Sequence, residues 1–294
     1  MPGDGYGSIT PVPLPDAPAG IQTGERARAV SRRPADRAQW ERHITMTSGD
    51  SGDSGDSGDG GDGGDTAALD DPVGESLRGR HAALGRRLGR AATYLPGVAT
   101  FSAVPADADA ADWAGLARLL GRDAFADMFS CQAPPPPDWE QVFVLEGRQM
   151  IWPGSGHPDR AHAVTGADVV ELGAGDVPQM LDLVAQTRPG PFWPRTLELG
   201  TYLGIRDGGR LVAMAGERLR PPGWTEISAV CTAPEARGRG HAARLVSTLV
   251  ARVLARDERP FLHVAETNNG AFALYARLGF VSRKHVTFRG FRTP

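Results

Sequence analysis

The chain has 294 residues, enough for about two domains of the usual size. Its 32 lysines and arginines stand against 35 acidic residues, a formal net charge of -3, so charge gives no reason to expect a nucleic-acid partner. No run approaches the ~18–20 apolar residues of a membrane span, and the N-terminus lacks the basic start and apolar core of a secretory signal. With only Cys131 and Cys231, a disulfide framework or a cysteine zinc site is excluded. We therefore expect a cytoplasmic protein with no metal and no membrane contact.

Residues 1–67 are predicted to be a disordered tail. Residues 1–45 are rich in Pro, Gly, Ala and Arg without sustained apolar periodicity, so they cannot bury enough surface to offset the entropy of ordering. Residues 48–65 comprise eight Gly, six Asp and four Ser, a composition typical of a flexible, self-repelling linker. Because residues 1–67 hold 6 Arg and 11 acidic residues, the acidity of the chain belongs to this tail.

Residues 68–160 are predicted to form a mixed α/β half in which no catalytic cluster is evident. Hydrophobic spacing and Pro-rich breaks divide this half into helices and strands. The expected elements are a helix at 75–94, an extended segment at 98–104, a helix around Trp113, Leu116, Leu119 and Leu120, a strand at 124–130 and one or two strands at 139–152.

Residues 161–294 alternate more clearly between strands and helices. The helix at 241–256 is the best supported, because its apolar residues form a single stripe. The full expected order is a strand at 169–172, a helix capped by Asp176, a loop or short helix at 188–200, a hairpin at 201–220, a strand at 224–232, the helix at 241–256, a strand at 259–266, a helix at 268–279 and a final strand or pair at 280–291.

The strand at 224–232 carries candidate functional residues on both faces. Successive side chains of a strand point to opposite faces. This alternation predicts one face with Glu226, Ser228, Val230 and Thr232, and an opposite face with Ile227, Ala229 and Cys231.

The turn after this strand is the most informative stretch of the chain. Gly238 and Gly240 lie where small residues open the long helix, so backbone N–H groups and the positive end of the helix dipole face one place. Such a turn suits a diphosphate, and Arg237 and Arg239 add positive charge at its rim. The alternative is an ordinary loop and helix cap that uses glycine for its geometry.

The same residues also satisfy a dinucleotide-binding pattern. The sequence from Gly238 to Ala243 reads Gly-x-Gly-x-x-Ala, and Asp257 follows 19 residues after Gly238. A dinucleotide fold, however, places these glycines directly at the end of its first strand, in a doubly wound parallel series. Here five residues intervene and a predicted hairpin precedes the strand, so a dinucleotide-binding oxidoreductase is the weaker alternative.

Two motifs together resemble the GNAT superfamily of acyl-CoA-dependent N-acyltransferases. The first is Arg237-x-x-Gly240-x-Ala242 after a strand, and the second is Asn268-x-x-Ala271-x-x-Leu274-Tyr275-x-x-x-Gly279-Phe280. The resemblance covers residues 169–288. It implies an α/β fold with a mixed, mostly antiparallel sheet flanked by helices. Residues 68–160 would then be the degenerate half of a two-part, glycine N-acyltransferase-like organisation, and residues 161–294 the catalytic domain.

The resemblance also implies acetyl-CoA as co-substrate and assigns residues to it. The turn would hold the diphosphate, the end of the preceding strand would pair with the pantetheine arm, and Asn268 would reach that arm while capping its own helix. The implied contacts are Val230, Cys231, Thr232, Arg237, Gly238, Arg239, Gly240, His241, Ala242 and Asn268.

Two residues are the expected catalytic groups. In the family, a tyrosine at the position of Tyr275 protonates the departing thiolate, and a phenol with a pKa of ~10 suits that task. Its alternative role is that of a core aromatic. Glu226 is the candidate base for the amine, with His263 and Glu266 as further candidates. Cys231 has no supporting His or Asp pattern, so an acylated cysteine is not expected.

The loop before the hairpin is the candidate acceptor side. Phe192, Trp193 and Arg195 lie in it, and the resemblance implies that this region lines the acceptor pocket. Packing of the loop on the sheet as a hydrophobic lid is the alternative. The expected activity is acetyl transfer to a primary amine of a small molecule or peptide, by a monomer or homodimer. A non-catalytic acyl-CoA sensor or scaffold is the second hypothesis.

Overall fold

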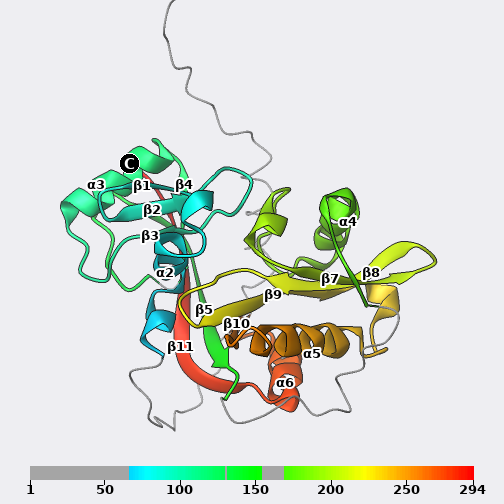
Figure 1. Ribbon diagram of the computed structural model, residues 1–294. Coiled ribbons are helices and arrows are strands. Elements are labelled where there is room, and N and C mark those ends of the chain that lie inside the picture. The colour runs from blue at the N-terminus through cyan, green and yellow to red at the C-terminus, as the bar shows by residue number, and fades with distance from the viewer. Residues whose placement is uncertain (1–65, 130, 154–168) are drawn as a thin grey trace, which may run out of the picture.

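The computed structural model describes residues 66–129, 131–153 and 169–294. Most of the predicted tail, its Gly-Asp-Ser segment and the boundary expected at residue 160 lie outside these residues. The described chain forms an eight-stranded mixed sheet, in the order β4-β11-β5-β10-β9-β8-β7-β6, and a small three-stranded sheet, β1-β2-β3 (Figure 1). This confirms the predicted α/β fold class. Since β9 and β10 are the only parallel neighbours of the larger sheet, the described strands are not a doubly wound dinucleotide fold.

The N-terminal part departs from its predicted pattern. The helix expected at 75–94 is wrong beyond residue 78: α2 ends at Arg78, and a β-hairpin occupies 85–94. Gly79 follows the helix directly, and Gly89, at φ +61°, makes the hairpin turn that a continuous helix could not contain. The elements are η1 Ala67–Asp70, α2 Pro72–Arg78, η2 Ala82–Leu84, β1 Gly85–Leu88, β2 Ala91–Tyr94, β3 Ser102–Ala103 and α3 Ala110–Leu120.

Helix α3 confirms the predicted second helix. The Asp109 side chain accepts the N–H groups of Ala111 and Asp112, and the Asp112 carboxylate accepts the N–H of Asp109, so the helix begins with a reciprocal capping box. Trp113 and Leu116 are buried against the sheet.

The last strand of the chain joins the two halves. β11 (Val281–Arg292) lies between β4 (Phe125–Phe129) and β5 (Glu140–Ile151), antiparallel to both. β5 pairs along its other edge with β10 (Arg259–Ala265). The segments expected as one or two strands are therefore single twelve-residue strands. The sheet runs without interruption from the N-terminal strands into the C-terminal part.

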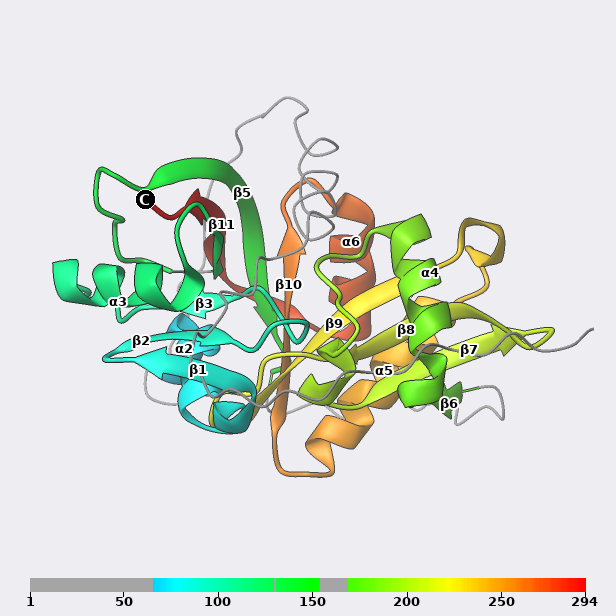
Figure 2. The same cartoon turned by 90° about the horizontal axis from the view of Figure 1, so that it is seen from above.

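Helices cover both faces of the C-terminal strands. α4 packs on β8 and β9 from one face, and α5 packs on β8, β9 and β10 from the other, with α6 beside it (Figures 1 and 2). Asp176 precedes α4 without capping it, since its carboxylate accepts Gly173 N–H and pairs with Arg206. The elements are β6 Val169–Glu171, η3 Ala174–Asp176, α4 Val177–Thr187, η4 Thr196–Leu199, β7 Tyr202–Asp207, β8 Arg210–Glu217, β9 Trp224–Thr232, η5 Pro234–Ala236, α5 His241–Leu254 and α6 Asn269–Leu278.

A β-bulge in β9 changes which side chains share a face. Gly216 of β8 pairs with Ser228, whereas Met214, two residues away on the same face, pairs with Cys231. The extra residue in β9 coincides with Ala229 at φ +53°. Ser228 and Cys231 therefore point to one face, and Val230 and Thr232 to the other, so the predicted faces of Cys231, Val230 and Thr232 are wrong. Burial raises the pKa of the Cys231 thiol to about 11, while a hydrogen bond with Thr187 of α4 acts against this rise.

Candidate active site

The site begins where two parallel strands separate. The pairing of β9 with β10 covers Arg259↔Trp224, Pro260↔Thr225 and Phe261↔Glu226, and then ends. β9 continues to Thr232, while β10 continues to Ala265 along β5. The β9 residues beyond Glu226 therefore keep their β8 neighbours but leave their other edge unpaired with β10. An edge of this kind offers backbone groups to an extended ligand.

The free edge leads directly to the turn that starts α5. Gly238 and Gly240 have φ of +78° and +76°, and a Cβ placed on either would meet no atom within 4 Å. Gly240 is the N-cap of α5, and no side chain caps the helix. The first N–H groups of a helix have no partner inside it, so this turn presents donors and a positive dipole end to an open surface. The geometry fits a diphosphate.

The two arginines of the turn lie at its exposed rim. Arg237 Nε donates to the Thr232 carbonyl at 3.4 Å, and Arg239 pairs with Asp207 at 3.3 Å. Both guanidinium groups can supply positive charge, but solvent screens them. His241 and Ala242 follow as the first two residues of α5 and are half-buried.

The other predicted coenzyme contacts lie on the last residues of β9 and at the start of α6. Val230 and Thr232 of β9 are half-buried, whereas Cys231 is buried toward α4. Asn268 is exposed and caps α6, where its side-chain oxygen accepts Ala271 N–H at 3.1 Å. The helix-capping role of Asn268 is thus present.

Tyr275 lies on α6, the helix that follows β10. Its side chain is buried, and its ring meets that of Phe280 edge-on at 6.1 Å. Burial raises the pKa of the phenol above its usual value of 10. The group therefore stays protonated at neutral pH and is able to donate a proton. Packing in the core and proton donation are compatible for this residue.

Glu226 is enclosed and fully paired. Arg218 donates to its two carboxylate oxygens at 2.8 and 2.6 Å, and His263 Nδ1 lies 2.7 Å from Oε1. Burial alone would raise the pKa of Glu226, but the charge and hydrogen bonds of Arg218 and the hydrogen bond of His263 lower it to about 2. A carboxylate with this pKa and no free oxygen is a weak base. The geometry therefore weighs against the base role expected from the sequence.

His263, a second candidate base, is held on both sides. Gln149 Nε2 lies 3.1 Å from His263 Nε2 and is an amide donor, so Nε2 accepts and Nδ1–H donates to Glu226. Burial lowers the pKa of His263, against the influence of Glu226, and the ring is neutral. Glu266, the third candidate, is paired with Arg148 at 2.8 Å on the exposed end of β10.

Arg218 is the functional residue that sequence reasoning missed. Its guanidinium carbon lies 5.0 Å from the ring centroids of both Phe101 and Phe129, which come from the N-terminal part of the chain. Asp127 lies nearby and is buried; burial raises its pKa to about 7, while Thr100 and the charge of Arg218 act against this rise. In the sequence, the only sign of such a residue is Glu226 itself, because an acidic side chain in a buried strand needs a cationic partner.

The candidate acceptor loop packs as a lid. Phe192 and Trp193 are buried, and the Phe192 ring meets that of Tyr202 edge-on at 5.5 Å. Arg195 is exposed, pairs with Glu198, and donates its backbone N–H to Gly97 at 2.9 Å. Phe192 and Trp193 therefore pack on the sheet as a hydrophobic lid, which is the alternative to a role in the acceptor pocket. Arg195 anchors the loop to the N-terminal part.

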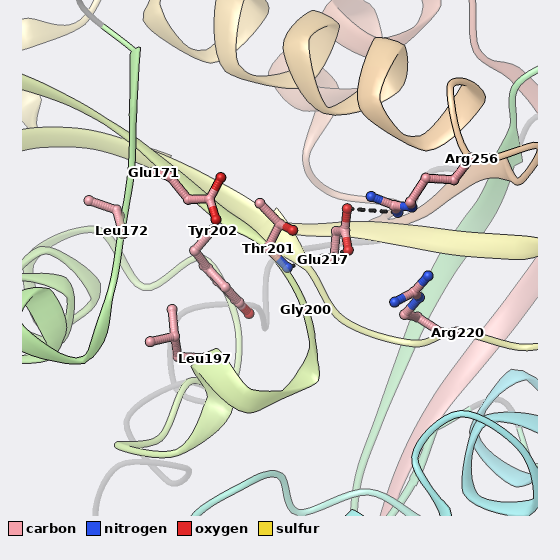
Figure 3. A pocket seen from close by; sticks show the side chains of 9 residues that line it. All are labelled: Glu171, Leu172, Leu197, Gly200, Thr201, Tyr202, Glu217, Arg220 and Arg256. Carbon is pink, nitrogen blue, oxygen red and sulfur yellow. Dashed lines mark hydrogen bonds and ion pairs between the residues drawn. The ribbon is translucent and has the colours of Figure 1, made fainter.

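A hollow of about 410 Å³ lies at the opposite end of α5 from the glycine turn. Glu217 and Arg256 form an ion pair in its wall at 2.9 Å, and Arg220 lies beside them (Figure 3). Apolar and polar side chains complete the lining. The lining residues are Glu171, Leu172, Leu197, Gly200, Thr201, Tyr202, Glu217, Arg220 and Arg256.

Comparison with known proteins identifies the fold. The family model of FR47-like proteins matches residues 202–289. A solved structure from Novosphingobium aromaticivorans DSM 12444, described as an acetyltransferase of the GNAT family, is 38% identical; the match has a TM-score of 0.70 and covers 77% of this chain and 99% of the other. The chain belongs to the GNAT superfamily. No curated protein sequence matches it.

More distant GNAT structures share the same architecture. A GCN5-related N-acetyltransferase from Kribbella flavida is 18% identical with a TM-score of 0.50, and covers 78% of this chain and 95% of its own. A GCN5-related N-acetyltransferase-like protein from Streptococcus suis 89/1591 is 17% identical with a TM-score of 0.50, covering 77% and 96%. The GNAT fold indicates acetyl transfer, so the chain is a transferase.

The described residues contain neither a candidate metal cluster nor a helix that could span a membrane. In residues 66–129, 131–153 and 169–294, no three His, Cys, Asp or Glu side chains group in a way that could hold a metal ion. Over the same ranges, none of the helices has the length and apolar character needed to cross a membrane.

Proposed function

We propose that this GNAT protein transfers the acetyl group of acetyl-CoA to a primary amine of a small molecule or peptide, by direct attack in a ternary complex. The observation that carries the proposal is the continuity of two features. The edge of β9 becomes free of β10 after Glu226, and the same strand leads to the uncapped start of α5. One extended ligand with a diphosphate fits both features.

The residues of the turn would hold the diphosphate. N–H groups at the start of α5, with Gly238 and Gly240 keeping the approach open, supply the donors. Arg237 and Arg239 add charge at the rim, and the backbone of β9 from Val230 to Thr232 lies along the route of the pantetheine arm. Asn268, at the start of α6, would reach the same arm.

Acyl transfer requires one bond to form and one to break. The amine nitrogen bonds to the acetyl carbon, the carbon–sulfur bond breaks, and the amine loses one proton while sulfur gains one. Tyr275 is the proposed donor to sulfur: burial keeps its phenol protonated, and Cys231 of β9 lies close enough to act on its pKa, which supports a place beside the unpaired end of β9. The ordinary pKa of a phenol lies near that of a thiol, and the enclosure that raises the pKa of Tyr275 would also raise that of a thiol formed beside it.

Glu226 contributes to the site as an anchor in this proposal. Its carboxylate neutralises Arg218 and orients His263 at the point where the strands separate. Since neither Glu226 nor His263 is free to take a proton, the acceptor enters as the neutral amine. The proton that it loses on attack leaves to solvent, and a proton from solvent restores the Tyr275 phenol after the transfer.

The test is a thiol-release assay with acetyl-CoA across amino acids, polyamines, aminoglycosides and peptide N-termini. Release that depends on one class of amine supports the proposal. Binding of acetyl-CoA without release for any amine would instead support the second hypothesis, a non-catalytic acyl-CoA sensor. Cytoplasmic location and a monomeric or homodimeric state remain predictions from the sequence.

A further inference from the structure

The side chain of Tyr202 crosses the sheet beneath the lid loop. Tyr202 of β7 pairs with Gly216 of β8, which pairs with Ser228 of β9. A Cβ placed on Gly216 would lie 2.3–2.5 Å from carbons of the Tyr202 ring, so the ring occupies the space above this glycine. The phenol thus runs from β7 across β8 toward β9. A larger residue than glycine at position 216 would block this path.

The hydroxyl of Tyr202 has no hydrogen-bond partner among the described residues. The residue is 1% exposed, and its hydroxyl oxygen is fully enclosed. Tyr94 is also buried, but its hydroxyl is satisfied by His81 Nδ1 at 2.8 Å. Because almost all buried polar groups in proteins are paired, the unpaired phenol of Tyr202 requires an explanation.

The position of the Tyr202 phenol offers an explanation for its unpaired hydroxyl. Ser228 lies two residues beyond Glu226, at the point where β9 loses its pairing with β10. The bulge places Ser228 and Cys231 on the α4 face, opposite the face covered by α5 and α6. Burial raises the pKa of Tyr202, and the charges of Arg218 and Glu226 also act on it, which agrees with a buried phenol near Glu226, where the pairing of β9 with β10 ends.

We propose that Tyr202 is an acceptor-contacting residue, whose phenol oxygen accepts an N–H hydrogen bond from the attacking amine on the α4 face of the gap. The inference rests on the proposed function. A neutral amine has an N–H group and a lone pair on one nitrogen, so a hydrogen bond from N–H to the phenol turns the lone pair toward the thioester. The hydroxyl is enclosed beneath the lid loop, whose Phe192 ring packs edge-on against the Tyr202 ring, so the amine reaches the phenol when this loop moves aside.

The first test is Tyr202→Phe, which removes only the hydroxyl. For an acceptor found by thiol release, kcat/KM is expected to fall about tenfold, the value of one lost hydrogen bond. The affinity for acetyl-CoA should stay unchanged, and the unfolding midpoint should stay the same or rise because an unpaired polar group is gone. Tyr94→Phe is the matched control: it breaks the bond to His81 and should lower the midpoint without lowering kcat/KM.

The second test has a readout independent of turnover. The chain has four tyrosines, so 3-fluorotyrosine labelling gives few ¹⁹F resonances, and Tyr202→Phe assigns that of Tyr202. Adding n-butylamine to the CoA complex is expected to shift this resonance. Absence of a shift, or unchanged kcat/KM in Tyr202→Phe, would overturn the assignment. Failure of the wild-type protein to release thiol with any amine would instead contradict the proposed function, and the ¹⁹F shift would still decide whether Tyr202 meets an amine.

Discussion

Arg218 holds Glu226 through two hydrogen bonds, of 2.8 and 2.6 Å, where neither side chain is open to solvent. Arg218 itself is stacked between two aromatic rings of the N-terminal part. The pair therefore fastens the N-terminal part to the strand that borders the proposed active site. It also pairs both carboxylate oxygens of Glu226, which weighs against the base role expected from the sequence.

Glu226→Gln is expected to destabilise the protein by about 3–5 kcal/mol, because it leaves the charge of Arg218 buried without a partner. Adding Arg218→Met removes that charge and should restore most of the loss. Urea unfolding of the single and double variants measures both effects. If the two substitutions simply added their losses, the buried pair would not be the cause.

Turnover per folded molecule should stay within a few-fold of the wild-type value in Glu226→Gln. Complete loss of turnover would return Glu226 to the base role.

The pH dependence of kcat/KM tests how the amine loses its charge. If the acceptor enters as the neutral amine, kcat/KM rises tenfold per pH unit up to the pKa of that amine. Two acceptors with different amine pKa values should then give two different inflections. A single inflection shared by both acceptors would point to an ionising group of the protein instead.

Tyr275→Phe should lower kcat by about 10²-fold, the scale of general acid catalysis, and leave the affinity for acetyl-CoA within about twofold. The phenyl ring keeps the contact with Phe280, so the fold should be preserved. Pre-steady-state thiol release and calorimetry separate the two quantities. Equal losses in both, or no loss in turnover, would assign Tyr275 to the core alone.

Gly240→Asp is expected to weaken acetyl-CoA binding by at least about tenfold, because a carboxylate at the start of α5 repels a diphosphate. Gly223→Asp is the matched control. Gly223 has the same φ of +76° and equally open surroundings, but it lies in the turn before β9, at the other end of that strand. Both variants carry the same backbone strain and the same charge. If both lost affinity equally, the turn at α5 would not be the binding site.

His81 should make stability depend on pH between about 6.5 and 4. Its Nε2–H donates to the Leu199 carbonyl and Nδ1 accepts from Tyr94, and burial lowers its pKa to about 4. The pKa of His81 is thus lower in the folded than in the unfolded state. Its contribution to the free energy of unfolding is therefore complete above pH 6.5 and is lost as pH falls. About 3 kcal/mol of unfolding free energy is expected to disappear. His81→Gln should flatten this part of the urea-stability profile; an unaltered slope would exclude His81 as its source.

Local sequence patterns predicted the elements that their own residues determine. The strand Trp224–Thr232 and the helix starting at His241 lie at their predicted residues, since burial against one sheet determines both, although the alternation gave the wrong face for Cys231. The glycine turn between them was equally readable, because Gly238 and Gly240 adopt backbone angles that other residues rarely take.

The remaining features depend on contacts between distant segments. The sequence predicts a helix over residues 85–94, because the apolar residues there are compatible with a helix or a strand. Their pairing with β3 and packing against α3 decide for the hairpin. The bulge at Ala229 appears only in the register with β8. The partner of Glu226, Arg218, directly follows the end of β8, and the rings that enclose Arg218 come from residues 101 and 129. No spacing rule connects such positions.

The most direct test of the central claim is a single-turnover measurement of product stoichiometry. Excess protein is mixed with acetyl-CoA and an amine that supports thiol release, and the acetylated amine is counted by mass spectrometry against the CoA formed. Direct transfer predicts one acetylated amine per CoA in the presence of amine, and an unmodified protein mass in its absence. CoA formation without acetylated amine, or an acetylated protein before amine is added, would contradict it.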